Sequence, residues 1–181
     1  MNIFRNNRAL IVLTAVFIGA LCRLIPHPPN FTPILSIAII GGMYSRSLSF
    51  AILSTLGAMI VSDLFLGLHS LVPLTYGTLA LIAWLSRQTN NGRFSSALRM
   101  SAIGPVIFFI TSNFAVWLSS SFYPKTLLGL LYCFEAALPF FQNSLLSTAI
   151  YTSLLYLGIH FCSSIAPLHT NENTSNITSA S

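Results

Sequence analysis

The sequence predicts an all-α polytopic membrane protein with six transmembrane helices. Only 6% of its 181 residues are charged, whereas 54% are hydrophobic, and the mean hydropathy is +0.77. Soluble domains carry about 25% charged residues, and a soluble protein with so apolar a surface would aggregate. The apolar residues form long unbroken runs, not the alternating segments of about 10 residues that a membrane β-barrel requires. The composition therefore points to a bundle of membrane-spanning helices.

The first span is expected at residues 9–25, after a polar start that carries Arg5 and Arg8. A basic start before an apolar run also describes a secretory signal peptide. The end of this run, Gly19-Ala-Leu-Cys22, is a poor cleavage site, so we expect the segment to remain as a membrane span. Ala15 and Gly19 share one face of the expected helix, where small residues let another helix approach closely.

A proline-rich stretch, Arg23-Leu-Ile-Pro-His-Pro-Pro-Asn-Phe-Thr-Pro33, separates the first two spans. Proline lacks a backbone donor and pushes the residue before it to extended geometry, so residues 26–33 are predicted to form a stiff loop. The second span covers residues 31–44 and overlaps the end of this loop. Because this span is short for a full crossing, we expect an unusual tilt or a local thinning of the bilayer.

The next three spans are expected at residues 48–66, 70–85 and 100–118. The third span carries Asp63, one of only three acidic residues in the chain, near its end. The turn Gly67-Leu-His69-Ser70 leads into the fourth span. Residues 86–99 carry three arginines and form the clearest hydrophilic loop of the sequence.

The sixth span is expected at residues 139–161 and completes a single transmembrane domain over residues 1–166. Residues 127–138 are also apolar, and the whole stretch 127–161 is far longer than the roughly 20 residues that one crossing needs. Residues 127–138 are therefore either a separate short helix at the interface or a segment that re-enters part-way. The tail at residues 167–181 is rich in Asn, Ser and Thr and is predicted to be disordered.

The basic residues predict the orientation of the spans. If the N-terminus is cytoplasmic, only Arg23 and Lys125 face outward. The other six basic residues then face inward: Arg5, Arg8, Arg46, Arg87, Arg93 and Arg99. Such an excess of basic residues is typical of cytoplasmic loops. Six spans return the C-terminus to the cytoplasm, and we expect a multi-pass protein of the cell inner (plasma) membrane.

This orientation gathers the unusual polar residues at the outer face. The candidate solute-binding residues come from every outer hairpin: Arg23, His27, Asn30, Asp63, His69, Asn113, Trp117, Tyr132, Glu135 and Asn143. Ionisable and amide groups at membrane depth are costly, so they line a cavity or pair with one another. We expect a small-molecule pocket in which Arg23 faces an anionic or carbonyl group and the proline-rich loop forms a lid. In the other interpretation, the charges only neutralise each other and hold the loops together.

Other kinds of site have little support in the sequence. His27, His69 and Asp63 could ligate a metal, but they come from different loops without metal-binding spacing, so neither a metal site nor a cofactor is predicted. The sequence lacks GxSxG, HExxH and paired membrane aspartate motifs, so we do not expect an enzyme. Nucleic-acid signatures are absent, and the three scattered cysteines are expected to pack between helices.

Six blocks of the chain together resemble one family. They are Arg23-Leu-Ile-Pro-His-Pro-Pro-Asn-Phe-Thr-Pro33, Ser62-Asp-Leu-Phe-Leu-Gly-Leu-His69, Asn113-Phe-Ala-Val-Trp117, Tyr123-Pro-Lys-Thr126, Gly129-Leu-Leu-Tyr-Cys133 and Leu138-Pro-Phe-Phe-Gln-Asn143. They look like an uncharacterised family of small bacterial membrane proteins that is grouped with the substrate-binding S components of energy-coupling-factor (ECF) transporters. The similarity covers about residues 9–160.

The resemblance implies six membrane helices, cytoplasmic termini and a vitamin or micronutrient pocket near the outer face. It also implies that the first helix docks, through small residues at Ala15 and Gly19, onto a transmembrane coupling subunit driven by two cytoplasmic ATPases. The chain has no Walker motif, so ATP hydrolysis would belong to those partners. We therefore expect capture of a small polar solute for uptake. The alternative is a non-transport scaffold or assembly protein whose outer face binds another protein.

Overall fold

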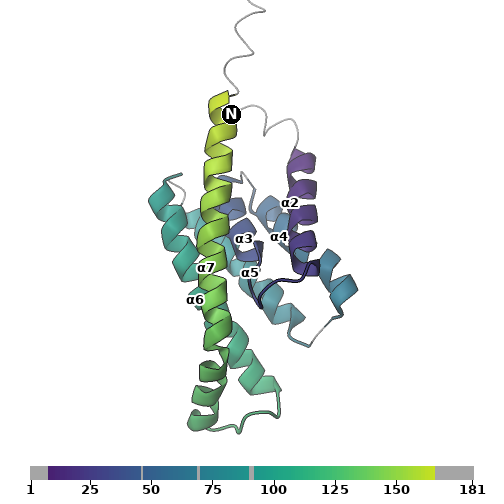
Figure 1. The fold of residues 1–181 in the computed structure, drawn as a ribbon, viewed down its shortest axis with the longest axis vertical. Helices are drawn as coiled ribbons and strands as arrows, with labels where there is room; N and C mark the ends of the chain where they lie inside the picture. The colour runs from purple at the N-terminus through teal and green to yellow at the C-terminus, as the bar shows by residue number, and fades with distance from the viewer. Residues whose placement is uncertain (1–7, 46, 69, 90–91, 166–181) are drawn as a thin grey trace, which may run out of the picture.

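The computed structural model describes residues 8–45, 47–68, 70–89 and 92–165 (Figure 1). In these ranges the chain forms six α-helices and no strand. The helices are α2 (Arg8–Leu24), α3 (Ile34–Tyr44), α4 (Leu48–Leu66), α5 (Val72–Gln88), α6 (Phe94–Ser119) and α7 (Leu127–Ile165). The predicted all-α fold class is confirmed, and the predicted tail at residues 167–181 lies outside the described residues.

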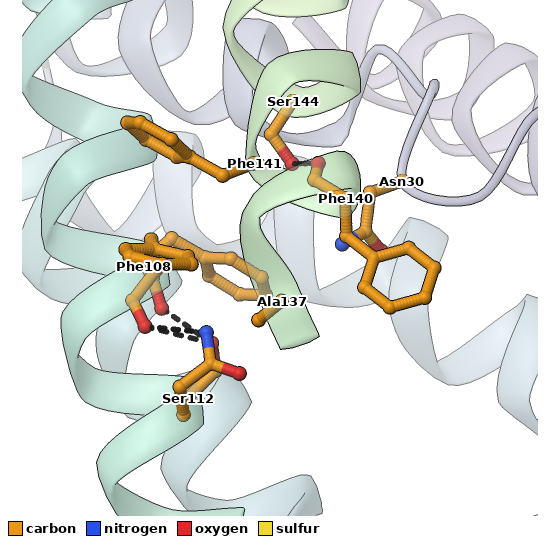
Figure 2. A pocket seen from close by; sticks show the side chains of 9 residues that line it. Asn30, Phe108, Ser112, Ala137, Phe140, Phe141 and Ser144 are labelled. Carbon is orange, nitrogen blue, oxygen red and sulfur yellow. Dashed lines mark hydrogen bonds between the residues drawn. The ribbon is translucent and has the colours of Figure 1, made fainter. Parts of the chain in front are cut away.

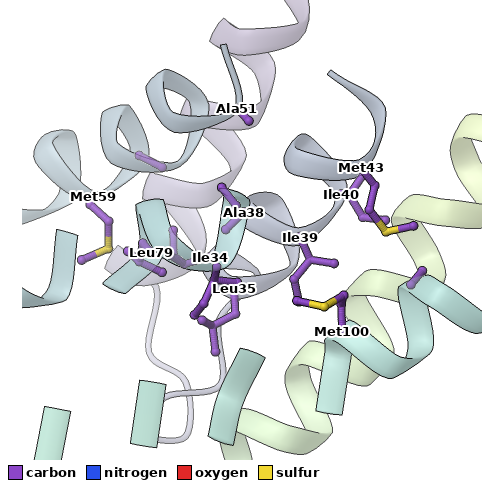
Figure 3. Packing of buried hydrophobic residues seen from close by; sticks show 14 residues of the cluster. Ile34, Leu35, Ala38, Ile39, Ile40, Met43, Ala51, Met59, Leu79 and Met100 are labelled. Carbon is purple, nitrogen blue, oxygen red and sulfur yellow. The ribbon is translucent and has the colours of Figure 1, made fainter. Parts of the chain in front are cut away.

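The short helix α3 lies at the centre of the bundle. Almost all of its 11 residues are buried, and it packs against α4, α5, α6 and α7. Its apolar side chains form the middle of a core cluster that Met59 of α4, Leu79 of α5 and Met100 of α6 complete (Figure 3). A helix that is apolar on every side is buried on every side. At 1.5 Å per residue α3 is about 16 Å long, roughly half the hydrocarbon thickness of a bilayer.

Hydroxyl groups fasten α3 to α7. The Ser36 hydroxyl donates to the carbonyl oxygen of Thr148 at 3.1 Å, and the Thr152 hydroxyl donates to Ser36 Oγ at 3.1 Å. All three residues are buried. Interhelical hydrogen bonds of this kind hold membrane helices together, because the hydrocarbon around them offers no polar partner.

Small residues let the other helices approach closely. A Cβ atom added to Gly42 of α3 would lie 2.2 Å from the backbone oxygen of Ala83 in α5. A Cβ atom added to Gly19 of α2 would lie 2.8 Å from the Cβ of Ala58 in α4. Such contacts bring backbones close enough for extensive van der Waals packing. Glycines therefore set the spacing of α3 from α5 and of α2 from α4.

The helices on either side of the predicted hydrophilic loop are longer than expected. α5 ends at Gln88, and α6 begins at Phe94 instead of residue 100. Residues 94–99 were expected in a loop because they include Ser and Arg. They are helical because Ser96 and Ala97 are fully buried in the bundle and their N–H groups bond to the carbonyl oxygen of Arg93. The loop prediction is thus wrong for these six positions.

The helix α7 is one continuous helix of 39 residues with Pro139 inside it. It differs from both arrangements expected for residues 127–138, a separate interfacial helix or a re-entrant segment. Its first half packs along α6, where the rings of Phe109 and Phe134 stand edge to face at 5.2 Å. This packing compensates for the helical hydrogen bond that proline removes. Together α6 and α7 form an antiparallel hairpin that projects beyond the other helices (Figure 1).

In the part of the chain that the structure describes, three helices are long and apolar enough to cross a membrane: α4, α6 and the Leu127–Phe161 part of α7. The chain also has two shorter apolar helical segments, Leu13–Leu24 and Ile34–Tyr44. Large apolar side chains are strongly exposed on the outside of the bundle, among them Phe17, Leu64, Phe65, Leu118, Leu127 and Phe161. A surface of this kind suits lipid and not water, and it indicates a membrane protein.

The start of α2 and the end of α7 lie at the same end of the bundle (Figure 1). There the Tyr44 and Tyr156 hydroxyls both donate to the carbonyl oxygen of Gly92, at 3.3 and 3.1 Å. Arg87 donates to the carbonyl oxygen of Ser45 at 3.1 Å. The proline-rich loop and the turn between α6 and α7 lie toward the other end, where most of the predicted site residues are found.

Candidate functional site

The loop at residues 25–33 connects α2 to the central helix α3. Within it, the N–H of Phe31 donates to the carbonyl oxygen of Pro28 at 2.9 Å and closes a turn. Asn30 has a φ of 62°, in the left-handed region that asparagine adopts more readily than other residues with a side chain. The prolines and this left-handed residue together give the loop its non-helical path.

Two side chains of α7 hold this loop in place. Asn143 Nδ2 donates to the carbonyl oxygen of Pro29 at 3.0 Å, and the Ser147 hydroxyl donates to that of Asn30 at 3.4 Å. Among apolar helices, non-helical backbone needs protein partners because lipid supplies none. The two hydrogen bonds therefore hold the loop against α7.

Replacing Asn143 by leucine is expected to weaken the attachment of the loop to α7. One neutral hydrogen bond contributes roughly 0.5–1.5 kcal/mol, so hydrogen exchange at the Phe31 amide should become about 2- to 10-fold faster. Hydrogen-exchange mass spectrometry of the purified protein measures this rate. Gln142→Leu is the matched control, since Gln142 is exposed on the same helix. Equal exchange in the two variants would contradict the role of Asn143.

A small pocket lies beside the loop, between α6 and α7 (Figure 2). Its volume is about 60 Å³. Nine residues line it, four of them phenylalanines: Asn30, Phe108, Phe109, Ser112, Asn113, Ala137, Phe140, Phe141 and Ser144. These nine lining residues include no charged side chain. The pocket is aromatic with a few neutral polar groups, which is the usual make-up of a small-molecule site.

The polar groups of the pocket differ in how fully they are bonded. Asn113 Nδ2 donates to the carbonyl oxygen of Phe109 at 2.8 Å, which leaves its Oδ1 as an acceptor. The hydroxyls of Ser112 and Ser144 donate to carbonyl oxygens one turn back in their own helices. The Asn30 carboxamide has no hydrogen-bond partner among the described residues. The pocket therefore offers one amide donor and two amide acceptors to a bound molecule.

The charged residues Arg23 and Asp63 form a second polar centre, between α2, α4 and α5. Arg23 Nη1 lies 2.8 Å from Asp63 Oδ1 and 2.8 Å from the sulfur of Met59. The Tyr76 hydroxyl donates to Asp63 Oδ2 at 2.9 Å. The Asp63 side chain is 1% exposed and that of Arg23 is 18% exposed. Both oxygens of the carboxylate thus have a partner, and the pair joins three helices.

Trp117 and Lys125 belong to the turn between α6 and α7. Trp117 Nε1 donates to the carbonyl oxygen of Pro124 at 3.0 Å. Lys125 Nζ donates to the carbonyl oxygens of Trp117 and Ser120 and lies 5.7 Å from the centre of the Trp117 ring. These contacts close the turn, so neither side chain points to a role in the pocket.

The predicted site residues are thus divided by the structure. Asn30 and Asn113 line the pocket, and Asn143 holds the loop beside it. Arg23 does not face the pocket as expected, because it is paired with Asp63. Tyr132 and Glu135 are exposed on α7 and do not line the pocket.

The histidines and the predicted docking residues have other surroundings. His27 is exposed, with Nδ1 2.6 Å from the carbonyl oxygen of Ile25, and His69 lies outside the described residues. In the described ranges no three His, Cys, Asp or Glu side chains gather to hold a metal ion. Ala15 is half-buried, whereas Gly19 is buried against α4 inside the protein. Gly19 therefore serves internal packing and offers no surface to a partner.

The sequence-based prediction missed the phenylalanines and serines of the pocket, and also Tyr76. A signal was present in a pattern shared by two helices: Phe108-Phe-Ile-Thr-Ser-Asn113 in α6 and Phe140-Phe-Gln-Asn-Ser144 in α7. Residues four apart share a helix face, so each pattern places an aromatic ring next to a small polar group. Two such faces packed against each other make the pocket.

One family is similar to this chain over almost its whole length. The profile of one family, described as "Family of unknown function (DUF6580)", matches residues 4–169. Neither a curated protein nor a solved structure gives a significant match. The family match includes the loop, the pocket and the Arg23–Asp63 pair. The chain therefore belongs to the Family of unknown function (DUF6580).

Proposed function

We propose that this protein is a membrane transport protein, similar to the S components of ECF transporters, that captures a small polar solute at the outer face of the inner membrane. The loop at residues 25–33 carries this proposal. Its non-helical, partly exposed backbone is held against α7, and it brings Asn30 to the lining of an aromatic pocket. Non-helical backbone among membrane helices is tolerated where it is buried in protein or lines a water-filled cavity.

The depth of the loop supports a site inside the membrane region. Asn143, which holds the loop, lies about 24 Å along the helix from the start of α7 at 1.5 Å per residue. Exposed apolar side chains, including Leu127 and Leu131, cover much of this part of α7. The loop thus lies well short of the tip of the α6–α7 hairpin and beside apolar helix surface, which suits a solute site reached from outside.

The proposed topology has six spans with both termini in the cytoplasm. Six of the eight basic residues then lie on the cytoplasmic side, in agreement with the positive-inside rule. The shared position of the α2 start and the α7 end agrees with an even number of crossings (Figure 1). In this topology the central helix α3 and the loop before it together take up one crossing.

The loop is the proposed lid of the site. Small-molecule sites usually enclose about 300–1,000 Å³, which is several times the volume of this pocket. A vitamin-sized solute therefore requires the loop to move outward, and two hydrogen bonds to α7 are what must break. Capture would follow as the loop closes again over the solute.

Delivery of the solute requires partners. In this proposal a transmembrane coupling subunit with two cytoplasmic ATPases supplies the energy. The exposed face of α2, with Leu13, Phe17 and Leu21, is the surface on which the first helix would dock. Since Gly19 faces α4, docking would use these larger side chains beside Ala15.

The test is native mass spectrometry of the protein gently purified from its own membrane. We expect a retained small molecule and co-purified ATPase subunits. Asn113→Leu removes a pocket amide, so it should reduce the amount of retained molecule about 2- to 10-fold. Gln142→Leu, outside the pocket, should retain the molecule as the wild type does.

The alternative function is a scaffold or assembly protein. The projecting α6–α7 hairpin favours it, because Phe122 at its turn is 86% exposed. A protein that retains no small molecule and co-purifies with a different protein bound at this turn would support the scaffold and contradict transport.

A further inference from the structure

We infer that the pocket selects an uncharged, flat solute with an amide-like edge, of which a ring carboxamide is the simplest example. This inference rests on the proposed function, since it names the class of solute that the same site would take. It follows from the rings, the hydrogen-bonding groups and the charges around the pocket.

The rings favour a flat solute. Four phenylalanines line the pocket, from α6 on one side and α7 on the other (Figure 2). The ring centres of Phe109 and Phe141 are 4.6 Å apart, and their planes differ by 32°. Aromatic rings at such distances pack best on other flat groups, in offset or edge-to-face arrangements. An aromatic solute could therefore extend the ring packing that already joins the two helices.

The polar groups favour an amide. The Asn30 carboxamide has no hydrogen-bond partner among the described residues, and the Oδ1 of Asn113 has spare acceptor capacity. An amide carries both a donor and an acceptor on one edge, which are the groups that Asn113 Oδ1 and the Asn30 carboxamide can bond. Asn30 is exposed, so water can bond its carboxamide in the free protein, and a solute that covers it has to replace those hydrogen bonds.

The charges exclude an ionic solute. Arg23 and Asp63 neutralise each other and are absent from the pocket lining. Lys125 is bonded to carbonyl oxygens in the hairpin turn, and Glu135 is exposed on α7 outside the lining. An ion entering the pocket would lose its hydration without gaining a counter-charge, which is far more costly than burying a neutral amide. The site should therefore reject anions and cations alike.

The volume limits the size of the bound group. About 10–15 Å³ holds one water-sized group, so the 60 Å³ of the pocket holds about five such groups. A single six-membered ring with its amide exceeds this by a few atoms. A small outward shift of the loop would make room for the remaining atoms. Breaking the Asn143 bond would allow such a shift.

Three probes of nearly equal shape test the charge rule: benzamide is neutral, benzoate is an anion and benzamidine is a cation. Calorimetry or saturation-transfer NMR on the full-length protein in detergent measures their binding. We expect benzamide to bind at least 10-fold more tightly than either ion. Tighter binding of benzoate or benzamidine, or binding of none of the three, overturns the inference.

The variant Asn30→Gly tests the amide contact without disturbing the loop. Glycine adopts a φ of 62° without strain, so the backbone can stay as it is while the carboxamide is lost. In Asn30→Gly, benzamide binding should weaken at least 5-fold, while the thermal unfolding temperature should match that of the wild type. The control Gln142→Leu should bind benzamide as the wild type does. Unchanged benzamide affinity in Asn30→Gly overturns the proposed contact.

The failure of this inference can be told apart from the failure of the transport proposal. The probe experiment needs only the purified protein, whereas transport also requires the ATPase partners. Benzamide binding without co-purified ATPases would contradict transport and leave the pocket chemistry standing. A retained charged molecule together with co-purified ATPases would support transport and contradict the inferred pocket chemistry.

Discussion

Replacement of Asp63 by asparagine is expected to destabilise the protein severely. The carboxylate is 1% exposed and 2.8 Å from Arg23, which is itself mostly buried. Removing one member of a buried ion pair leaves the other charge uncompensated and costs about 3–5 kcal/mol. The loss of stability should lie at the lower end of this range, because the Arg23 side chain is 18% exposed and keeps some contact with solvent. Thermal unfolding of the purified variant in detergent measures the loss.

A double variant separates the charge from the packing. Replacing both partners with apolar residues, Arg23→Met with Asp63→Leu, removes the pair without leaving a buried charge. Such replacements are often neutral or stabilising, so the double variant should regain much of the lost stability. If Asp63→Asn instead kept full stability and lost solute binding, the pair would be a binding group and not a link between helices.

Replacement of Gly42 by alanine is expected to force α3 away from α5. The added Cβ would lie 2.2 Å from the backbone oxygen of Ala83, and a backbone atom cannot turn aside as a flexible side chain can. Overpacking of a close-packed core typically costs about 1–3 kcal/mol, and a clash with backbone belongs at the upper limit. Because α3 is the centre of the bundle, the loss of stability should appear as a lower unfolding temperature. The hydrodynamic radius of the protein in detergent should also increase.

Gly77→Ala is the matched control for this prediction. Gly77 lies in α5, the helix that Gly42 of α3 contacts, but a Cβ there would meet no atom within 4 Å. Alanine is the better helix former by about 1 kcal/mol, so Gly77→Ala should be as stable as the wild type or more so. Equal stability of the two variants would show that the close contact of α3 with α5 does not limit the fold.

The two predictions concern the framework of the protein, and the pocket lies outside both. The charged centre links α2, α4 and α5, whereas the pocket lies between α6, α7 and the loop. This separation explains why a neutral pocket can exist in a chain that also carries a buried charged pair. It also makes binding and stability separately measurable in the variants described above.

Much of the fold was predictable from the sequence because the signal is local. Unbroken apolar runs predict helices wherever they occur, and the prolines from Pro26 to Pro33 exclude a helix there. The bounds of α4 were predicted correctly. The errors lie where tertiary contact extends a helix into a polar segment, as at Phe94, or carries it through a proline, as at Pro139.

The pairing of the polar residues could not be predicted in the same way. The sequence offered two interpretations of Arg23 and Asp63, solute contact or mutual neutralisation, and periodicity cannot choose between them. The choice depends on whether α2 and α4 are neighbours, which follows from small residues such as Gly19 and Ala58 fitting together. In the structure the two side chains form an ion pair.

Three features follow from the sequence alone: an all-helical chain, apolar segments long enough for a membrane, and a stiff loop before the second of those segments. Composition and local pattern suffice for that, since each helix forms from residues close together in the chain. Only the tertiary structure placed α3 at the centre, set Asn143 of α7 against the loop at Pro29, and brought Asn30 and Asn113 to one pocket. Those contacts join residues far apart in the chain, and their geometry depends on how whole helices pack.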